Sequence, residues 1–130
     1  MICPCGSKKE FSQCCEPYIS EKTLPETPEQ LMRSRYSAYT KANIDYIQKT
    51  MSGNAVKDFN AEEAQRWAKR AKWLDLTVIN ASPIENNQST VEFIARYIYN
   101  GKIEKIHEIS LFEKINGRWF YTDNSFSNTK

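Results

Sequence analysis

Apolar residues recur at helical spacing in three successive stretches of the chain. A first helix is predicted over residues 28–41, because Thr27 supplies an N-cap and Pro28 suits the first helical turn. A second, short helix is predicted to follow Asn43 and to end near residue 51. A third is predicted to open at the capping sequence that begins with Asn60 and to continue to about residue 72.

After residue 73 the pattern alternates or runs in short branched apolar stretches, which is typical of strands. Four strands are predicted, at residues 74–82, 90–99, 103–115 and 118–124. Asn100-Gly101 and Asn116-Gly117 are strong hairpin signals, so the last three strands should form an antiparallel meander. Helices followed by such a meander predict an α+β fold.

Two-residue turns would fix which side chains share a face of this sheet. With the two Asn-Gly turns, Phe93 opposes Glu108 across the first hairpin, and Ser110 opposes Asp123 across the second. One face is then aromatic with a short polar row, and it carries Val91, Phe93, Ala95, Tyr97, Ile106, Glu108, Ser110, Phe112, Trp119, Tyr121 and Asp123. The opposite face carries Ile94, Arg96, Ile98, His107, Ile109, Leu111, Phe120 and Thr122. A β-bulge in either hairpin would reverse part of this assignment.

All four cysteines of the chain, Cys3, Cys5, Cys14 and Cys15, lie near its N-terminus. Four soft thiolates so close in sequence are typical of a tetrahedral structural Zn²⁺ site. Gly6 would let the backbone turn its amide groups toward the sulfurs. Disulfides are the alternative: a bridge between adjacent cysteines would need a distorted peptide, whereas pairing Cys3 with Cys14 and Cys5 with Cys15 remains open in an oxidising compartment.

The cysteine segment resembles the SEC-C zinc motif, C-x-C-x8-C-[CH], named after the C-terminal tail of the SecA translocation motor. Gly6, Ser7, Lys8, Lys9 and Phe11 are in register with that motif. The resemblance implies a zinc knuckle whose exposed residues, from Lys8 to Gln13, contact a protein partner. An export- or ribosome-associated component is the implied partner, so a non-catalytic zinc-binding adaptor is the expected function.

Composition excludes several classes of protein. The chain has 130 residues, about one domain, and 40% of them are hydrophobic, which is enough for a buried core. Its formal net charge of +2, which four zinc-bound thiolates would bring near zero, gives no reason to expect nucleic acid as a partner. No apolar run reaches the ~18 residues of a membrane span. Since no secretory signal is apparent, a cytoplasmic location is expected.

Five further segments, at residues 31–39, 73–76, 91–97, 107–112 and 117–123, resemble the bacterial YchJ family. This resemblance implies a nuclear-transport-factor-2-like body, in which a curved antiparallel sheet wraps around about three helices to form a cone. It divides the chain into a zinc knuckle (1–16), a polar linker (17–26) and a cone-shaped α+β domain (27–130). The family's biochemical role is largely undefined, so the resemblance assigns no activity.

In the cone fold, one face of the sheet lines a cavity that the first helix covers. The candidate cavity residues are Arg33, Arg35, Tyr39, Glu108, Ser110, Phe112, Trp119, Tyr121 and Asp123. A carboxylate among aromatic rings must be paired or protonated, and Arg35 is the expected partner of Glu108 or Asp123. Three interpretations remain open: a structural ion pair, a pocket in which Arg35 binds an anionic small molecule, and an acid–base enzyme.

The enzyme interpretation has the least support in the sequence. His107 is the only histidine, and the register puts it on the face opposite to Glu108 and Asp123, where it cannot form a dyad with either. No catalytic residue is therefore assigned.

Overall fold

Four strands form one antiparallel sheet in the order β1-β2-β3-β4. The structure is a computed structural model that describes residues 1–124. The strands are β1 (Lys72–Ala81), β2 (Gln88–Tyr99), β3 (Lys102–Ile115) and β4 (Arg118–Asp123). Asn100 and Asn116 each open a tight turn with φ 52° and are followed by a glycine that also has positive φ, as type I′ hairpin turns require. The predicted hairpins and the α+β class are confirmed.

The register of the sheet agrees with the prediction except at its end. The pairing of β2 with β3 is as predicted along the whole hairpin. The pairing of β3 with β4 is as predicted as far as Phe112, which opposes Tyr121. A bulge then pairs Asp123 with Leu111 in place of Ser110. Because an extra residue reverses the alternation of side chains, the prediction that Asp123 shares the inner face with Ser110 is wrong.

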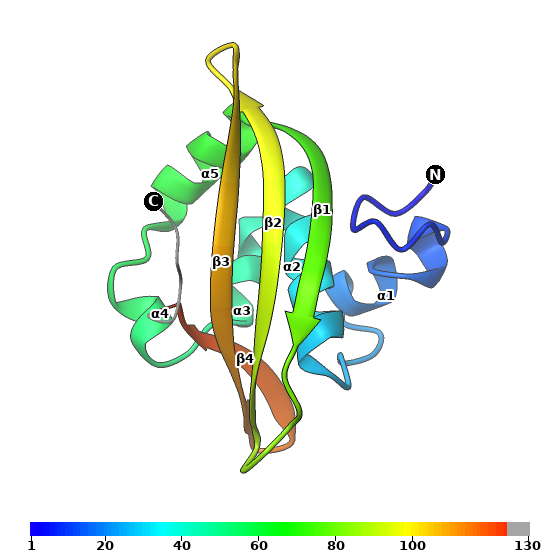
Figure 1. Cartoon of the computed structure of the whole chain (residues 1–130), viewed down its shortest axis with the longest axis vertical. Helices are drawn as coiled ribbons and strands as arrows, with labels where there is room; N and C mark the ends of the chain where they lie inside the picture. The colour runs from blue at the N-terminus through cyan, green and yellow to red at the C-terminus, as the bar shows by residue number, and fades with distance from the viewer. Residues whose placement is uncertain (125–130) are drawn as a thin grey trace.

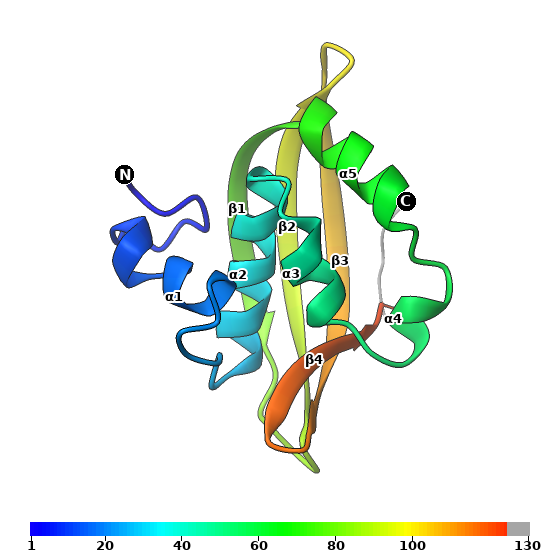
Figure 2. The same ribbon diagram turned by 180° about the vertical axis from the view of Figure 1, so that it is seen from behind.

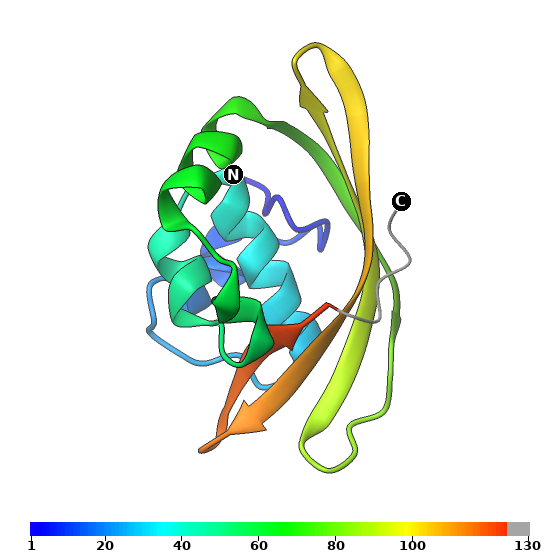
Figure 3. The same cartoon turned by 90° about the vertical axis from the view of Figure 1, so that its left-hand side faces the viewer.

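The helices of the body lie together on the concave side of the sheet, and none of the helices within residues 1–124 covers its other face (Figures 1, 2 and 3). They are α2 (Pro28–Thr40), α3 (Ile44–Lys49), α4 (Asn54–Lys57) and α5 (Ala61–Arg70). Thr27, Asn43 and Asn60 cap α2, α3 and α5, and each side-chain oxygen accepts a hydrogen bond from the backbone N–H three residues later. The three predicted helices are confirmed. The single turn α4, which follows Gly53, was not predicted.

The N-terminal segment lies beside α2 and the β1 edge of the sheet (Figure 1, blue). It contains a short 3-10 helix, η1 (Phe11–Gln13), and one helical turn, α1 (Glu16–Ile19). Tyr18 and Ile19 of α1 are partly buried against the hydrophobic core. Residues 17–26 therefore begin with a short helix that packs on the body.

One hydrophobic core includes both the N-terminal segment and the body. Cys3, Cys5 and Cys15 are buried in the same cluster as Leu31 of α2 and Phe112 of β3. The cysteines thus contribute to the packing of the body as well as to their own segment. Within residues 1–124, no helix is both long and apolar enough to cross a membrane.

Candidate functional site

Cys3, Cys5, Cys14 and Cys15 bring their sulfur atoms together. All four Sγ atoms lie within 4.8 Å of one another, and all four thiols are free. The Sγ–Sγ distance is 3.6 Å between Cys5 and Cys14 and 3.9 Å between Cys14 and Cys15. Four sulfurs bound tetrahedrally to one metal ion at ~2.3 Å would lie about 3.8 Å apart. The cluster therefore has both the donor set and the size of a structural metal site.

The four thiols cannot all ionise without a cation. The hydrogen bond from Cys15 lowers the pKa of Cys5 to about 4, and the same contact raises the pKa of Cys15. Burial raises the pKa of Cys14. A thiolate is thus favoured at one position and opposed at its neighbours, and negative charges this close also repel one another. A divalent cation would remove the conflict by stabilising all four thiolates together.

The cysteine cluster is packed directly against α2. Ser37, a buried residue of α2, places its Oγ 3.5 Å from Sγ of Cys3. Arg33, one turn earlier on the helix, donates from Nη1 to the carbonyl oxygen of Cys5 over 2.7 Å. Such contacts orient metal ligands from outside the coordination sphere. The body therefore supplies part of the environment of the cysteine site.

The knuckle, residues 1–16, has an inner side against the sheet and an exposed polar side. Gly6 has φ 89°, and a Cβ there would lie 3.2 Å from the carbonyl oxygen of Leu76 in β1. Glycine is suited to this position because it tolerates both the positive φ and the close approach. Lys8, Lys9 and Gln13 are also exposed.

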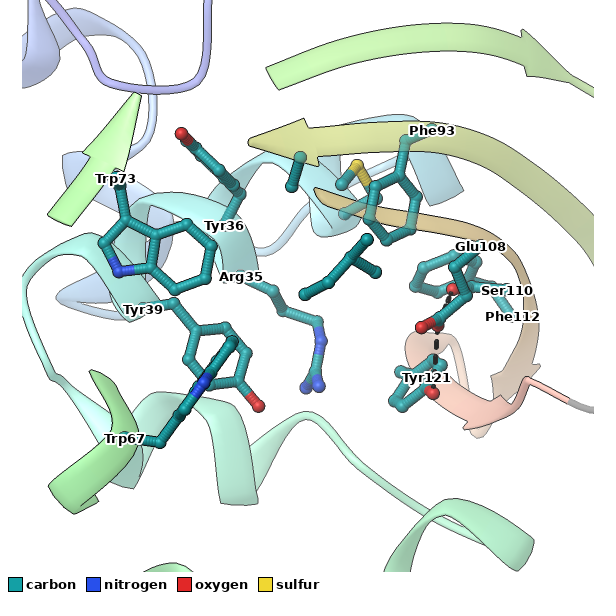
Figure 4. Close-up of a pocket in the computed structure, with 13 residues that line it drawn as sticks. Arg35, Tyr36, Tyr39, Trp67, Trp73, Phe93, Glu108, Ser110, Phe112 and Tyr121 are labelled. Atoms are coloured by element: carbon teal, nitrogen blue, oxygen red, sulfur yellow. Dashed lines mark hydrogen bonds between the residues drawn. The ribbon is translucent and has the colours of Figure 1, made fainter. Parts of the chain in front are cut away.

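A cavity of about 260 Å³ lies between α2, α5 and the inner face of the sheet (Figure 4). At one end Trp67 packs edge to face on Trp73 and Tyr39, with ring centroids 5.2 Å and 5.9 Å apart. Two charged residues, Arg35 from α2 and Glu108 from β3, also line the cavity. The full lining consists of Met32, Arg35, Tyr36, Tyr39, Trp67, Trp73, Phe93, Ala95, Ile106, Glu108, Ser110, Phe112 and Tyr121.

Arg35 is held on the helical side of the cavity. Its Nη1 donates to the carbonyl oxygen of Ile47 over 2.8 Å and to Oγ1 of Thr50 over 2.6 Å. These acceptors lie at the end of α3, where the helix dipole is negative. The guanidinium carbon lies 4.7 Å from the centre of the Tyr121 ring, a cation–π contact. Burial lowers the pKa of Arg35 from its usual value, while the neighbouring tyrosines and the charge of Glu108 oppose this shift.

Glu108 is held on the sheet side of the cavity. Its Oε2 accepts hydrogen bonds from Oγ of Ser110 at 2.5 Å and from the hydroxyl of Tyr121 at 3.2 Å. Burial, followed by the charge of Glu108, raises the pKa of Tyr121. The phenol therefore stays protonated and donates a hydrogen bond to Glu108. Among the described residues no ion pair joins Arg35 to Glu108 or to Asp123, and the predicted salt bridge is wrong.

Six of the nine residues predicted from the sequence line the cavity: Arg35, Tyr39, Glu108, Ser110, Phe112 and Tyr121. The other three lie elsewhere. Arg33 binds the cysteine segment, and Trp119 is buried with its Nε1 donating to the carbonyl oxygen of Glu26 over 3.2 Å. Asp123, displaced by the bulge, accepts a hydrogen bond from Nδ2 of Asn54 over 3.3 Å.

Several lining residues were not among the sequence candidates: Met32, Tyr36, Trp67, Trp73, Phe93, Ala95 and Ile106. The predicted register had already put Phe93, Ala95 and Ile106 on the inner face, so that signal was available. Trp67 lines the cavity because α5 packs beside α2 and α3, an arrangement that the sequence pattern does not predict. His107 pairs with Glu92 over 2.8 Å, outside the set of residues that line the cavity.

Comparison with known proteins identifies the two parts of the chain. Residues 27–124 match the family described as "YchJ, middle NTF2-like domain", and residues 2–17 match the SEC-C motif. The chain is 40% identical over 123 residues to the UPF0225 protein YchJ of Shigella dysenteriae, a match that covers 94% of this chain and 81% of that protein. It is also 40% identical over 125 residues to a UPF0225 protein of Actinobacillus succinogenes, covering 95% and 81%.

Two solved structures are similar over nearly the whole chain. The solution structure of a SEC-C motif containing protein from Rhodopseudomonas palustris has a TM-score of 0.86 at 36% identity, covering 96% of this chain and 98% of that one. The crystal structure of a SEC-C motif containing protein from Psychrobacter arcticus has a TM-score of 0.83 at 29% identity, covering 96% and 82%. Both resemblances seen in the sequence are confirmed, and the chain belongs to the YchJ (UPF0225) family, with an N-terminal SEC-C motif and an NTF2-like body.

Proposed function

We propose that the chain binds a small molecule in the cavity between α2, α5 and the sheet. The observation that carries this proposal is the position of Arg35. Its side chain lines the cavity, and the residue is only 8% exposed (Figure 4). Within the described part of the chain it forms no ion pair or hydrogen bond with a carboxylate, although buried arginines are usually paired. A ligand with a hydrogen-bond acceptor would complete its contacts. Trp67 and Trp73 provide the aromatic surface that small-molecule sites use.

The cavity proposal is tested by titrating single-ring aromatic probes into the protein: phenol, benzoate, benzamide and benzamidine. Because Trp67 and Trp73 line the cavity, at least one probe should change tryptophan fluorescence saturably. Ala95→Leu, which fills cavity space, should abolish the response, whereas the matched variant Ile94→Leu on the opposite face of β2 should keep it. If no probe binds, or if Ala95→Leu binds as well as the parent, the proposal fails.

We also propose that the four cysteines hold one Zn²⁺ in a closed structural site. Four thiolates fill the zinc tetrahedron and leave no position for water or substrate, and the sulfur spacing fits such a tetrahedron. The metal would then fix the knuckle against α2, whose other side lines the cavity. Native mass spectrometry of protein purified under reducing conditions should show one zinc ion. A metal-free mass, lower by the four hydrogens that two disulfides remove, would overturn the assignment.

A second candidate function, contact with a protein partner, is favoured by the exposed side of the knuckle. Lys8, Lys9 and Gln13 are exposed, and Phe11 is fixed by Lys41, whose Nζ lies 4.6 Å from the ring centre. A rigid polar surface of this kind suits an adaptor. In a pull-down from bacterial lysate, Lys8→Glu with Lys9→Glu should release the partner while the cysteines stay intact. Capture that is unchanged by both substitutions would contradict an adaptor role.

A further inference from the structure

The two charged residues of the cavity attract each other, but within residues 1–124 no ion pair or hydrogen bond joins them. Arg35 is anchored to the end of α3, through Ile47 and Thr50, and Glu108 is anchored to its own sheet through Ser110 and Tyr121. In Figure 4 both side chains reach into the same space from opposite walls. The cavity therefore presents a positive group and a negative group that are separately fixed in place.

Each of these groups keeps unused hydrogen-bonding capacity. The guanidinium of Arg35 carries five N–H groups, and both of its contacts with protein acceptors use Nη1. For residues 1–124, Nε and Nη2 have no protein acceptor. Both donors to Glu108 use Oε2, and within the same residues Oε1 receives none. The cavity thus offers donors at one wall and an acceptor at the other.

This balance of charge restricts the ligand. An anion would gain at Arg35 but would be repelled by Glu108, and a cation would meet the opposite conflict. A molecule with no net charge that has both an acceptor and a donor avoids both penalties. The rings of Tyr39, Trp67 and Phe93 favour a planar apolar body, and about 260 Å³ is just below the ~300–1,000 Å³ of sites for drug-sized ligands.

We propose that the cavity selects small planar molecules without net charge, such as aromatic primary amides, whose acceptor binds Arg35 and whose N–H donor binds Glu108. This inference rests on the proposed function and replaces the anionic ligand that the sequence analysis kept as one of three interpretations. The inference makes Glu108 a specificity determinant. The Glu108 carboxylate accepts a hydrogen bond from the ligand and repels anions.

Calorimetric titration with three probes of equal size tests the inference. Benzamide is neutral, benzoate is an anion and benzamidinium is a cation, and all three carry the same ring. On the parent protein at neutral pH, benzamide should bind at least about fivefold more tightly than either charged probe. Glu108→Gln keeps an oxygen that accepts from Ser110 and Tyr121 but removes the charge, so it should raise benzoate affinity about tenfold.

Glu92→Gln is the matched control, because Glu92 pairs with His107 away from the cavity lining and should alter no affinity. If Glu108→Gln does not fold, the order of the three probes on the parent protein decides. Benzoate as the tightest probe, or benzoate affinity unchanged in a folded Glu108→Gln, would overturn the inference and leave the cavity as a binding site. Failure of all three probes, together with an unchanged fluorescence signal, would overturn the proposed function itself.

Discussion

Helix α2 separates the cysteine cluster from the cavity, and the two sites differ in how their polar groups are paired. On one side the knuckle brings together the sulfurs of Cys3, Cys5, Cys14 and Cys15, and Ser37 completes their surroundings. On the other side Arg35 forms no ion pair with a described carboxylate, and part of its hydrogen-bonding capacity stays unused. The first arrangement is closed and favours stability. The second is open and favours binding.

The origin of the residues also differs between the two sites. The cysteines come from one segment of fifteen residues, so a single ion can organise them. The polar groups of the cavity come from α2, β3 and β4, which the whole fold must bring together. Substitutions on the knuckle side should therefore act on metal binding and stability together, whereas those on the cavity side should separate binding from stability.

Removal of the metal should have the largest effect on stability. A strong chelator should lower the free energy of unfolding by several kcal/mol, because structural zinc contributes on the order of 10 kcal/mol to small metal-dependent domains. The sheet should remain folded, since most of its core lies outside the knuckle. Urea denaturation followed by circular dichroism measures the change, with zinc-saturated chelator as the control. An unchanged midpoint would show that the knuckle does not stabilise the body.

Arg35→Met should cost about 1–3 kcal/mol, because it leaves the acceptors at the end of α3 without their charged donor. It should also remove the binding of cavity probes. Arg66→Met, an exposed substitution on α5, is the control and should stay within about 0.5 kcal/mol of the parent. Urea denaturation of the three proteins measures the difference. Equal stability of Arg35→Met and Arg66→Met would contradict the anchoring of Arg35.

Alkaline pH should destabilise the fold through Tyr36, which lines the cavity. Burial, followed by the charge of Asp75, raises the pKa of Tyr36 to about 12. The unfolded chain loses this proton first, near pH 10, so stability is complete below that value and falls as pH rises toward the folded pKa. The loss should approach about 1.4 kcal/mol per pH unit. Tyr36→Phe should show a shallower decline in urea denaturation between pH 10 and 12, and an identical slope would contradict the assignment.

Ser37→Ala and Ser34→Ala form a matched pair on α2, since both serines are fully buried. Each should cost about 1 kcal/mol, but only Ser37 contacts a cysteine, whereas Ser34 pairs with the hydroxyl of Tyr46 over 2.7 Å. Ser37→Ala should therefore weaken metal binding about tenfold and Ser34→Ala should not. Competition with a coloured chelator measures both affinities. Equal metal affinity of the two variants would remove α2 from the metal environment.

The sequence predicted features that depend on local chemistry. Asn100-Gly101 fixed the register of β2 with β3 because the turn itself determines the pairing. The four cysteines and the caps at Thr27, Asn43 and Asn60 were identifiable for the same reason. Each of these sequence features lies within a few residues of the turn, metal site or helix start that it determines.

The errors came from contacts between distant segments. At the bulge before Asp123, Gly53 lies so close to Thr122 that a Cβ at Gly53 would be 3.6 Å from the carbonyl oxygen of Thr122. Beside it, the amide of Ser52 donates a hydrogen bond to the carbonyl oxygen of Tyr121. The prediction pairs Arg35 with a carboxylate because charged side chains are visible in the sequence. The carbonyl groups at a helix end, which Arg35 binds instead, are not. Backbone acceptors have no signature in composition or spacing, and they replaced the predicted salt bridge.

The central claim, that a ligand binds on one side of α2 without disturbing the metal site on the other, is tested most directly by nuclear magnetic resonance. In a titration of ¹⁵N-labelled, zinc-loaded protein with benzamide, the indole N–H signals of Trp67 and Trp73 should shift saturably. The signal of Trp119, which donates to Glu26 outside the cavity, and the amide of Gly6 in the knuckle should stay in place. Shifts confined to Trp119 and Gly6, or no shift at any indole, would contradict the account.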